Sequence, residues 1–245
     1  MSEAVEVPPR ARPRVTMNMA ASLDGKISTV DGGLSTFGGP EDLAQMDDLR
    51  ASADAVLIGG GTLRADDPPL LIRNPDVRRR RILSKNAPHP WNIVASSHLP
   101  EHPGGMRFFR EPETEKIVFT TGRVPPERRA AVSRFARVET VASDKSGRVD
   151  LREVVERLWA LGVRHLLLEG GGRLNFSMLQ ADLIDEIYLT ICPLAFGGRT
   201  APTVFDGAGL TSEHVRKFAL QHCRVGSLGD VLLRYGRPVL PPGEQ

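Results

Sequence analysis

Two glycine runs, each at the end of an apolar stretch, contain the residues of this chain best suited to hold a ligand. The first, Gly59 to Gly61, follows Ala55 to Ile58 and leads into Thr62. The second, Gly170 to Gly172, follows His165 to Glu169. Glycine lets the backbone approach a ligand closely, and the amides that open a following helix attract phosphate. The pattern therefore predicts two phosphate-binding strand ends.

Acidic residues stand beside both runs. Asp66 and Asp67 follow the first, and Glu169 ends a strand that is otherwise apolar. Such a carboxylate either contacts a ligand or accepts hydrogen bonds from glycine amides. Neither run matches the G-x-G-x-x-G fingerprint, because Arg64 and Asn175 stand where the third glycine belongs. Two glycine-rich strand ends facing one crevice nevertheless favour a dinucleotide, since ligands bind at the carboxyl ends of parallel strands.

The elements around these runs alternate between strand and helix, as a parallel sheet requires. The apolar pattern predicts strands over 15–21, 55–58, 91–95, 116–121, 138–142, 165–169 and 186–191. It predicts helices over 40–53, 125–135, 151–161 and 177–181. Two late stretches, 217–225 and 231–235, are typical of a hairpin. The sequence thus indicates an α/β fold, with a mostly parallel central sheet flanked by helices and an antiparallel C-terminal edge.

Two further segments have simpler interpretations. The pair Asp24-Gly25 predicts a hairpin turn that leads to residues 27–29, which needs no function to explain it, and contact of Asp24 or Lys26 with a ligand is the other interpretation. Residues 74–90 contain Arg78 to Arg81, with no aromatic residue interleaved. We interpret this stretch as a solvated loop rather than a nucleic-acid patch.

The composition is that of a soluble globular protein, with 245 residues, 40% of them hydrophobic and 25% charged. We expect a single domain over residues 14–236, with a flexible arm over 1–13 and a flexible tail over 237–245. The net charge of +2 is too small to predict a nucleic-acid partner. No apolar run is long enough to cross a bilayer and no signal peptide is recognisable, so we expect a cytoplasmic protein without a membrane partner.

The sequence lacks the residue patterns typical of metal sites and of nucleophilic serine enzymes. The two cysteines and six histidines form no H-E-x-x-H, C-x-x-C or zinc-deaminase pattern, so no metal site is expected. No G-x-S-x-G elbow occurs that would present a nucleophilic serine. Hydride transfer fits better, because a cofactor brings the reactivity and the protein need only hold two ligands in contact.

Three segments, VTMNMAASLDGKIS, GGGTLRADDPPLLIR and LLLEGGGRLNFSMLQADLIDEIYLTICPLAFGG, together resemble the pyrimidine reductases of riboflavin biosynthesis. The resemblance spans Arg14 to Tyr235 and implies a fold like that of dihydrofolate reductase. It implies NADPH-dependent reduction of the ribosyl group of 2,5-diamino-6-ribosylamino-4(3H)-pyrimidinone 5′-phosphate, with hydride going to C1′. The deaminase domain of the fused bacterial form does not occur in this sequence, and Asn18 replaces a lysine common in that form. Both features resemble the stand-alone archaeal or fungal type.

The resemblance also implies ligand contacts along these motifs. For NADPH they are Ala21, Thr62, Asp66, Ser96, Gly171, Gly172, Arg173, Leu174, Asn175, Phe176 and Ser177. For the phosphorylated pyrimidine they are Ser35, Arg50, Leu70, Arg73 and Glu169. The arginines are the natural partners of the 5′-phosphate. Glu169 and Asp66 are the candidate catalytic residues, which would orient substrate and nicotinamide.

Alternatives remain open at this point. The substrate could be the deaminated uracil, or a dihydrofolate or pterin on the same scaffold, because one fold hosts many substrates. The glycine runs could also serve a nucleotide-binding module that transfers no hydride. Members of the family are typically homodimers that pair through a sheet edge. Residues 187–196 are the segment suspected for that role, with an internal strand as the other interpretation.

Overall fold

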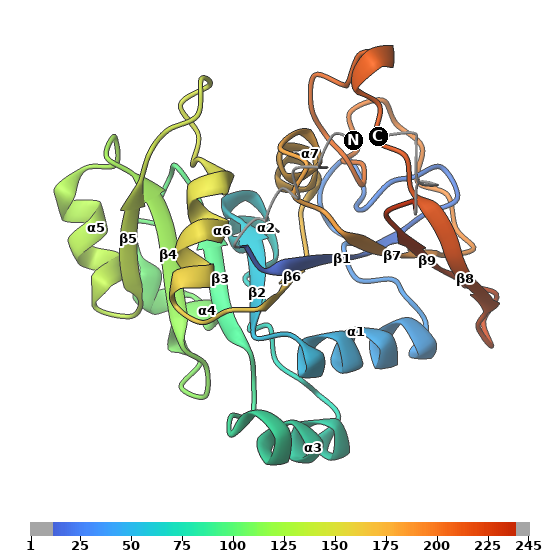
Figure 1. The fold of residues 1–245 in the computed structure, drawn as a ribbon, viewed down its shortest axis with the longest axis horizontal. Helices are drawn as coiled ribbons and strands as arrows, with labels where there is room; N and C mark the ends of the chain where they lie inside the picture. The colour runs from blue at the N-terminus through green and yellow to red at the C-terminus, as the bar shows by residue number, and fades with distance from the viewer. Residues whose placement is uncertain (1–11, 239–245) are drawn as a thin grey trace, which may run out of the picture.

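The computed structural model describes residues 12–238, and within them nine strands form one sheet, in the order β5-β4-β3-β2-β6-β1-β7-β9-β8 (Figure 1). The strands are β1 (Arg14–Ala21), β2 (Ala55–Gly59), β3 (Trp91–Ala95), β4 (Lys116–Thr121), β5 (Arg137–Val141), β6 (His165–Leu168), β7 (Glu186–Ile191), β8 (Ala219–Val225) and β9 (Val231–Gly236). Every pairing among β1 to β7 is parallel, whereas β9 runs antiparallel to both β7 and β8. The predicted α/β fold with an antiparallel C-terminal edge is confirmed.

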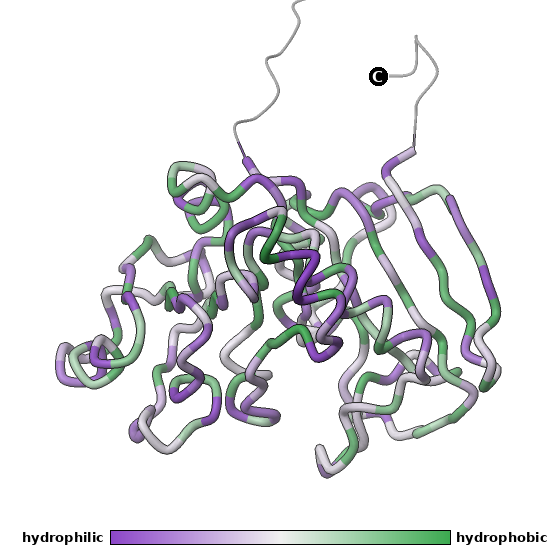
Figure 2. The backbone as a smooth tube through the Cα atoms, turned by 90° about the horizontal axis from the view of Figure 1, so that it is seen from below, coloured by the Kyte–Doolittle hydropathy of each residue, from purple (hydrophilic) through white to green (hydrophobic). Residues whose placement is uncertain are grey.

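Helices cover both faces of this sheet and enclose two apolar cores. They are α1 (Pro40–Ser52), α2 (Gly60–Asp66), α3 (Pro75–Lys85), α4 (Arg107–Arg110), α5 (Pro126–Ser133), α6 (Leu151–Ala160) and α7 (Gly172–Gln180), with single 3-10 turns at Pro103–Gly105 and Ser212–His214. Residues of α6 and α7 pack in one core, and residues of α1, α2, α4 and α5 pack in the other. Figure 2 shows hydrophobic and hydrophilic residues interspersed along the chain.

The central strands are apolar because both of their faces are covered. All five residues of β2 are buried, as in parallel sheets generally. On α6, Leu151, Val154, Val155 and Leu158 are buried at helical spacing. Gly162, with φ +94°, adopts the left-handed conformation that ends this helix.

The predicted hairpin after β1 does not form. Both neighbours of β1 are parallel strands, β6 and β7, so no antiparallel partner lies beside it. The turn itself is present, and residues 27–29 continue as irregular chain. Asp24 accepts hydrogen bonds from the amides of Phe196 (3.0 Å) and Gly197 (2.8 Å). This carboxylate therefore ties the turn to a distant loop.

The prediction of a solvated loop over 74–90 is wrong for most of that stretch, because residues 75–85 form α3. The Asn74 side chain caps the helix by accepting hydrogen bonds from the amides of Asp76 and Val77, and Pro75 opens it. Arg81, which the sequence suggested was solvated, is buried, and its guanidinium donates to the carbonyls of Ala51 (2.7 Å) and Ala53 (2.6 Å). The arginine run therefore belongs to a helix docked beside α1 (Figure 1).

The segment suspected of pairing two copies is internal. Strand β7 is hydrogen-bonded to β1 on one side and to β9 on the other, so its backbone has no free edge. The exposed edge at this end of the sheet is β8, whose seven residues are all exposed. The interpretation of 187–191 as an internal strand is confirmed.

Candidate active site

A buried ion pair between Arg50 and Glu169 joins α1 to the carboxyl end of β6. Arg50 Nε and Nη2 donate to the two carboxylate oxygens of Glu169, each at 2.7 Å. The side chains are 6% and 10% exposed. Burial lowers the pKa of Arg50, but the Glu169 carboxylate outweighs this effect and raises the pKa above its ordinary value. The pair is a buried, bidentate, charge-assisted contact.

The third nitrogen of the Arg50 guanidinium contacts the loop that follows α2. Arg50 Nη1 donates to the carbonyl oxygen of Leu71 at 2.7 Å, so the guanidinium holds both Glu169 and this loop. Arg50 was expected to contact the substrate phosphate. The structure instead engages its three nitrogens with protein acceptors, and a direct contact with substrate stays a prediction.

Asp47, on α1, holds the backbone of the same loop. Its carboxylate accepts hydrogen bonds from the amides of Arg73 (3.0 Å) and Asn74 (2.8 Å). Leu70 is buried and has a positive φ of 50°, whereas Arg73 is exposed. Among the described residues, the Arg73 side chain has no ion-pair partner. A loop held at its backbone thus presents one free cation.

The two glycine runs lie against each other, as predicted. Gly59 N donates to the carbonyl oxygen of Gly170 at 2.8 Å, and Gly171 N donates to Thr62 Oγ1 at 2.7 Å. A Cβ atom added to Gly171 would lie 3.1 Å from that hydroxyl oxygen. Gly170 has φ +81°, a conformation that favours glycine. The two runs therefore pack backbone against backbone, and side chains at Gly170 and Gly171 would disturb this contact.

Ser96 supports the beginning of α2. Its hydroxyl donates to the carbonyl of His98 (2.6 Å) and accepts from the His98 amide (3.1 Å). A Cβ atom on Gly60 would lie 2.1 Å from Ser96 Oγ, so this contact requires glycine. Ser35 and Asp66 form a second contact with α2, in which Ser35 Oγ donates to Asp66 Oδ1 at 2.6 Å. Both of these side chains are exposed.

The residues of α7 expected to contact a dinucleotide divide between surface and core. Leu174, Asn175 and Phe176 are buried, and Asn175 Nδ2 donates to the carbonyl of Val204 at 2.9 Å. Arg173 is exposed, Gly171 and Ser177 are half-buried, and the Ser177 hydroxyl donates to the Arg173 carbonyl. A Cβ atom on Gly172 would lie 2.2 Å from the carbonyl of Thr203, so the segment after β7 covers the start of this helix. Ala21, at the end of β1, is buried.

A group of hydrogen-bond acceptors that the sequence did not reveal lies between α1 and the sheet. We call Asn18, Asp42, Thr190 and Asp230 the acceptor cluster. Burial is the main cause of the raised pKa of Asp42, and the charges of Asp230 and Glu169 add to it. Burial, with the neighbouring Asp230 carboxylate, raises the pKa of the Cys192 thiol to about 12. Asp42 was recognised only as an acid in the first turn of a helix, where acids are common.

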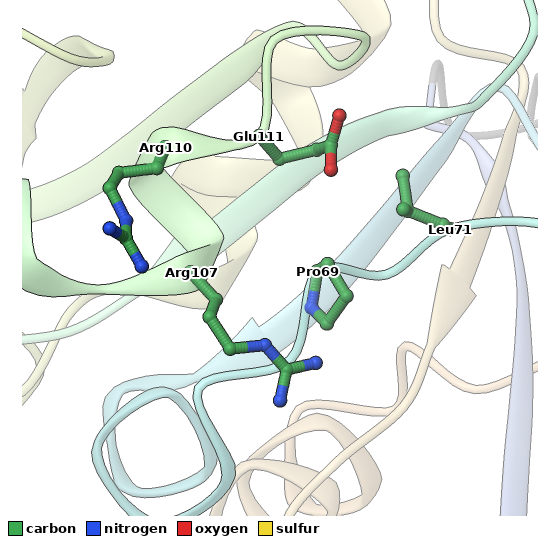
Figure 3. A pocket seen from close by; sticks show the side chains of 5 residues that line it. All are labelled: Pro69, Leu71, Arg107, Arg110 and Glu111. Carbon is green, nitrogen blue, oxygen red and sulfur yellow. The ribbon is translucent and has the colours of Figure 1, made fainter.

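A pocket of about 370 Å³ lies beside the loop that contains Pro69 and Leu71. It is lined by Pro69, Leu71, Arg107, Arg110 and Glu111. Figure 3 shows the two arginine side chains extending from α4, across from Pro69 and Leu71. None of the residues expected to contact cofactor or substrate lines this pocket, although Pro69 and Leu71 flank the expected Leu70.

Two absences hold for the part of the chain that the structure describes. Across residues 12–238, no three histidine, cysteine, aspartate or glutamate side chains group as metal ligands. In the same range, no helix combines the length and apolar character needed to span a bilayer.

The sequence profile described as the RibD C-terminal domain matches residues 13–231 of this chain. The chain belongs to this family. It is 36% identical over 222 residues to a protein of Methanothermobacter thermautotrophicus named 2,5-diamino-6-ribosylamino-4(3H)-pyrimidinone 5′-phosphate reductase, covering 91% of this chain and 96% of the relative. It is 37% identical over 196 residues to the Archaeoglobus fulgidus protein of the same name, covering 80% and 87%.

Solved structures of the family share the fold. A pyrimidine reductase-like protein of Corynebacterium diphtheriae superposes with a TM-score of 0.75 over 91% of each chain, at 18% identity. A riboflavin biosynthesis reductase of Saccharomyces cerevisiae superposes with a TM-score of 0.63 over 93% of this chain and 91% of that one, at 19% identity. The expected resemblance to the pyrimidine reductases, and with it the dihydrofolate-reductase-like fold, is confirmed.

We predict that Arg50→Met destabilises this RibD-family domain by about 3–5 kcal/mol, because Glu169 would be left as an unpaired buried charge. The free energy of unfolding, from chemical denaturation, is the measurement. The double variant Arg50→Met/Glu169→Gln should recover part of the loss, since it removes both charges. Arg73→Met is the matched control at an exposed arginine and should stay within about 0.5 kcal/mol. A loss of that small size for Arg50→Met would contradict the role assigned to the pair.

A second prediction concerns Asp42. Its folded-state pKa is raised, so its contribution to stability is present below the unfolded-state value of about 3.9 and is lost as the pH rises through the folded-state pKa. Ionisation of this carboxylate as the pH rises therefore destabilises the fold. Asp42→Asn should unfold at a higher temperature than the parent at pH 7, and the difference should shrink as the pH falls toward 4. The prediction would be wrong if the gain in unfolding temperature of Asp42→Asn over the parent were no larger at pH 7 than at pH 4.

Proposed function

We propose that this chain reduces the ribosyl group of 2,5-diamino-6-ribosylamino-4(3H)-pyrimidinone 5′-phosphate to the ribitylamino form, with NADPH as the reductant. The observation that carries the proposal is the near full-length likeness to two archaeal proteins of that name. The arrangement of the site supports it, because the two glycine-rich strand ends adjoin the carboxylate of Glu169, which pairs with Arg50, and a loop with an exposed arginine.

The glycine runs fit a dinucleotide. Gly171 and Gly60 lie where an added Cβ would approach Thr62 and Ser96, so backbone amides rather than side chains border this edge of the sheet. Thr62, Asp66, Ser96 and the beginning of α7 would hold the cofactor here. NADPH supplies the hydride when bound. The preference for NADPH over NADH is part of the proposal.

On the substrate side, each residue has a positioning task. Arg73 is the cation available to the 5′-phosphate, because Asp47 fixes its backbone and leaves its side chain free. Glu169, held in one orientation by Arg50, would accept a hydrogen bond from the substrate near the sugar. The ordered loop between Leu70 and Arg73 sets the distance between these two contacts. Such fixed geometry lowers the entropic cost of bringing the reacting atoms together.

Assembly and location complete the proposal. We expect a homodimer, in which the exposed edge strand β8 rather than the internal β7 is available for pairing. We also expect the protein to act in the cytoplasm, with no nucleic-acid or membrane partner. The single-domain organisation over residues 14–236 is retained as a further part of the proposal.

The test is NADPH oxidation by the purified protein, offered the diaminopyrimidinone ribosyl phosphate, its uracil counterpart and dihydrofolate in parallel. Turnover of the diamino compound is expected. Arg73→Ala should lower kcat/KM by about 1.5–3 kcal/mol, the loss of one charge-assisted contact, and leave the dissociation constant of NADPH unchanged.

Arg79→Ala, which changes an exposed arginine on α3, is the control and should match the parent. Turnover of dihydrofolate alone would replace the proposed substrate. Binding of NADPH without turnover of any compound would instead support a binding module, and equal weakening of substrate and cofactor by Arg73→Ala would contradict the role of that residue.

A further inference from the structure

The loop that joins α2 to α3 has no regular secondary structure, and we call its residues 69–73 the substrate loop. Side chains from other segments hold its backbone. Arg50 Nη1 donates to the carbonyl oxygen of Leu71 at 2.7 Å, and the amide of Ile72 donates to Nδ1 of His89 at 3.1 Å. The carbonyl of Leu71 and the amide of Ile72 belong to one planar peptide group. That group is therefore held on one edge by a guanidinium and on the other by an imidazole.

His89 can accept this hydrogen bond only as a neutral imidazole with its proton on Nε2. A nitrogen that accepts a hydrogen bond carries a lone pair, and neutral imidazole has one such nitrogen. Protonated histidine has an N–H at both positions, so Nδ1–H would oppose the N–H of Ile72. The His89 side chain is 1% exposed, which leaves little room for water to replace the lost acceptor. The contact therefore belongs to one protonation state of His89.

Charged groups of two segments face the imidazole. His89 Nε2 lies 3.7 Å from the Glu113 carboxylate, too far for a hydrogen bond, and has no hydrogen-bond partner within residues 12–238. Arg78, on α3, lies 3.7 Å from the same carboxylate. Burial has the largest effect on the pKa of His89 and lowers it, Glu113 and Glu111 raise it, and Arg78 lowers it. Because the pKa is below its ordinary value of about 6.5, the imidazole is neutral at pH 7 and takes up a proton only in acid.

The other contacts that hold the substrate loop come from different types of side chain. Asn92 Nδ2 donates to the carbonyl of Pro69 at 2.9 Å, and Asp47 Oδ1 accepts from the amide of Arg73 at 3.0 Å. Among the side chains that hold this loop, His89 is the one whose type ordinarily changes charge between pH 5 and 8. It is therefore the point at which the loop responds to acid.

We propose that His89 is a positioning residue, whose neutral imidazole holds the substrate loop in its binding conformation and whose protonation releases the loop and weakens binding of the phosphorylated substrate. The inference rests on the proposed function and deepens it, because Arg73, the proposed phosphate contact, directly follows Ile72. The released peptide group also carries the carbonyl that accepts from Arg50, so the change extends to the guanidinium that orients Glu169. His89 is not expected to contact either ligand and acts through this peptide.

The experiment measures the dissociation constant of the diaminopyrimidinone ribosyl phosphate by calorimetry from about pH 7.5 to about pH 5, the range in which histidine titrates. The parent is compared with His89→Asn and His89→Leu. Asparagine places Oδ1 at the position of Nδ1 and accepts a hydrogen bond without titrating, whereas leucine removes the acceptor. At the higher pH, His89→Leu should weaken binding about threefold to tenfold, the range for one hydrogen bond, and His89→Asn should stay close to the parent.

The pH profile separates positioning from a role in packing alone. As the pH falls, the parent should approach His89→Leu, and the ratio of its dissociation constant to that of His89→Asn should rise about threefold to tenfold. The substrate phosphate also titrates near pH 6, but it does so for both proteins, so the ratio removes its effect. His102→Asn, at an exposed histidine, is the matched control and should follow the parent at every pH. A ratio that stays constant over this range would overturn the inference.

A second measurement does not depend on the proposed function. Protection of the Ile72 amide against hydrogen exchange, followed by NMR without ligand, should be lower in His89→Leu than in the parent at neutral pH. In acid, it should fall in the parent but not in His89→Asn. Equal protection in these proteins would overturn the inference, even if the diamino compound is reduced.

The two measurements keep the inference and the proposed function distinguishable. Absence of pyrimidine binding by the parent would contradict the proposed function, whereas the protection of the Ile72 amide would still decide whether the loop depends on His89. If His89→Leu does not fold, the comparison of the parent with His89→Asn decides the question alone.

Discussion

The arrangement of the candidate site depends on one buried guanidinium. Arg50 contributes hydrogen bonds to both oxygens of Glu169 and to the carbonyl of Leu71, so one side chain fixes α1, the end of β6 and the loop that carries Arg73. A planar guanidinium suits this task, because its donors point in fixed directions and it stays charged when buried. A lysine could not reach three acceptors in these directions. The ion pair therefore matters chiefly for geometry, since buried pairs contribute little net stability over an apolar core.

Beside this satisfied pair lies a group of acids that the fold leaves unbalanced. Burial and the nearby carboxylates favour the protonated form of Asp42, so ionisation of this side chain lowers the stability of the fold. Sites that bind polar ligands often retain such a cost, which is offset when the ligand supplies the missing partners. The contrast with Asp47, whose carboxylate is fully engaged by two backbone amides one and a half turns later on α1, shows that the helix can satisfy a buried acid.

Much of the fold could be read from local pattern. The parallel strands, the α6 helix and the C-terminal hairpin each carry a periodic apolar signal, and both glycine runs were located from sequence with their meeting at one edge. The failures have identifiable causes. Four consecutive arginines masked α3, although Asn74 and Pro75 mark its beginning and Arg81 is buried against carbonyls of α1. The Asp24-Gly25 pair suggested a hairpin, whereas β1 lies between two parallel strands.

The site was harder to predict because its contacts are non-local. Arg50 and Glu169 are 119 positions apart, and nothing in either segment identifies the other as its partner. The acceptor cluster draws on β1, α1, β7 and the residue before β9, so it exists only once the sheet order is known. The resemblance of the motifs to the pyrimidine reductases named both members of the ion pair, but as separate substrate contacts and not as partners of each other. The role of each side chain could be assigned only once its hydrogen-bond and ion-pair partners were known.

The most direct test of the central claim follows the hydride itself. Purified protein would be incubated with the diaminopyrimidinone ribosyl phosphate and NADPH deuterated at the transferable position of the nicotinamide, and the product examined by NMR. We predict one deuterium at C1′ of the ribityl chain and none on the pyrimidine ring. Product without the label, or with the label on the ring, would contradict the account.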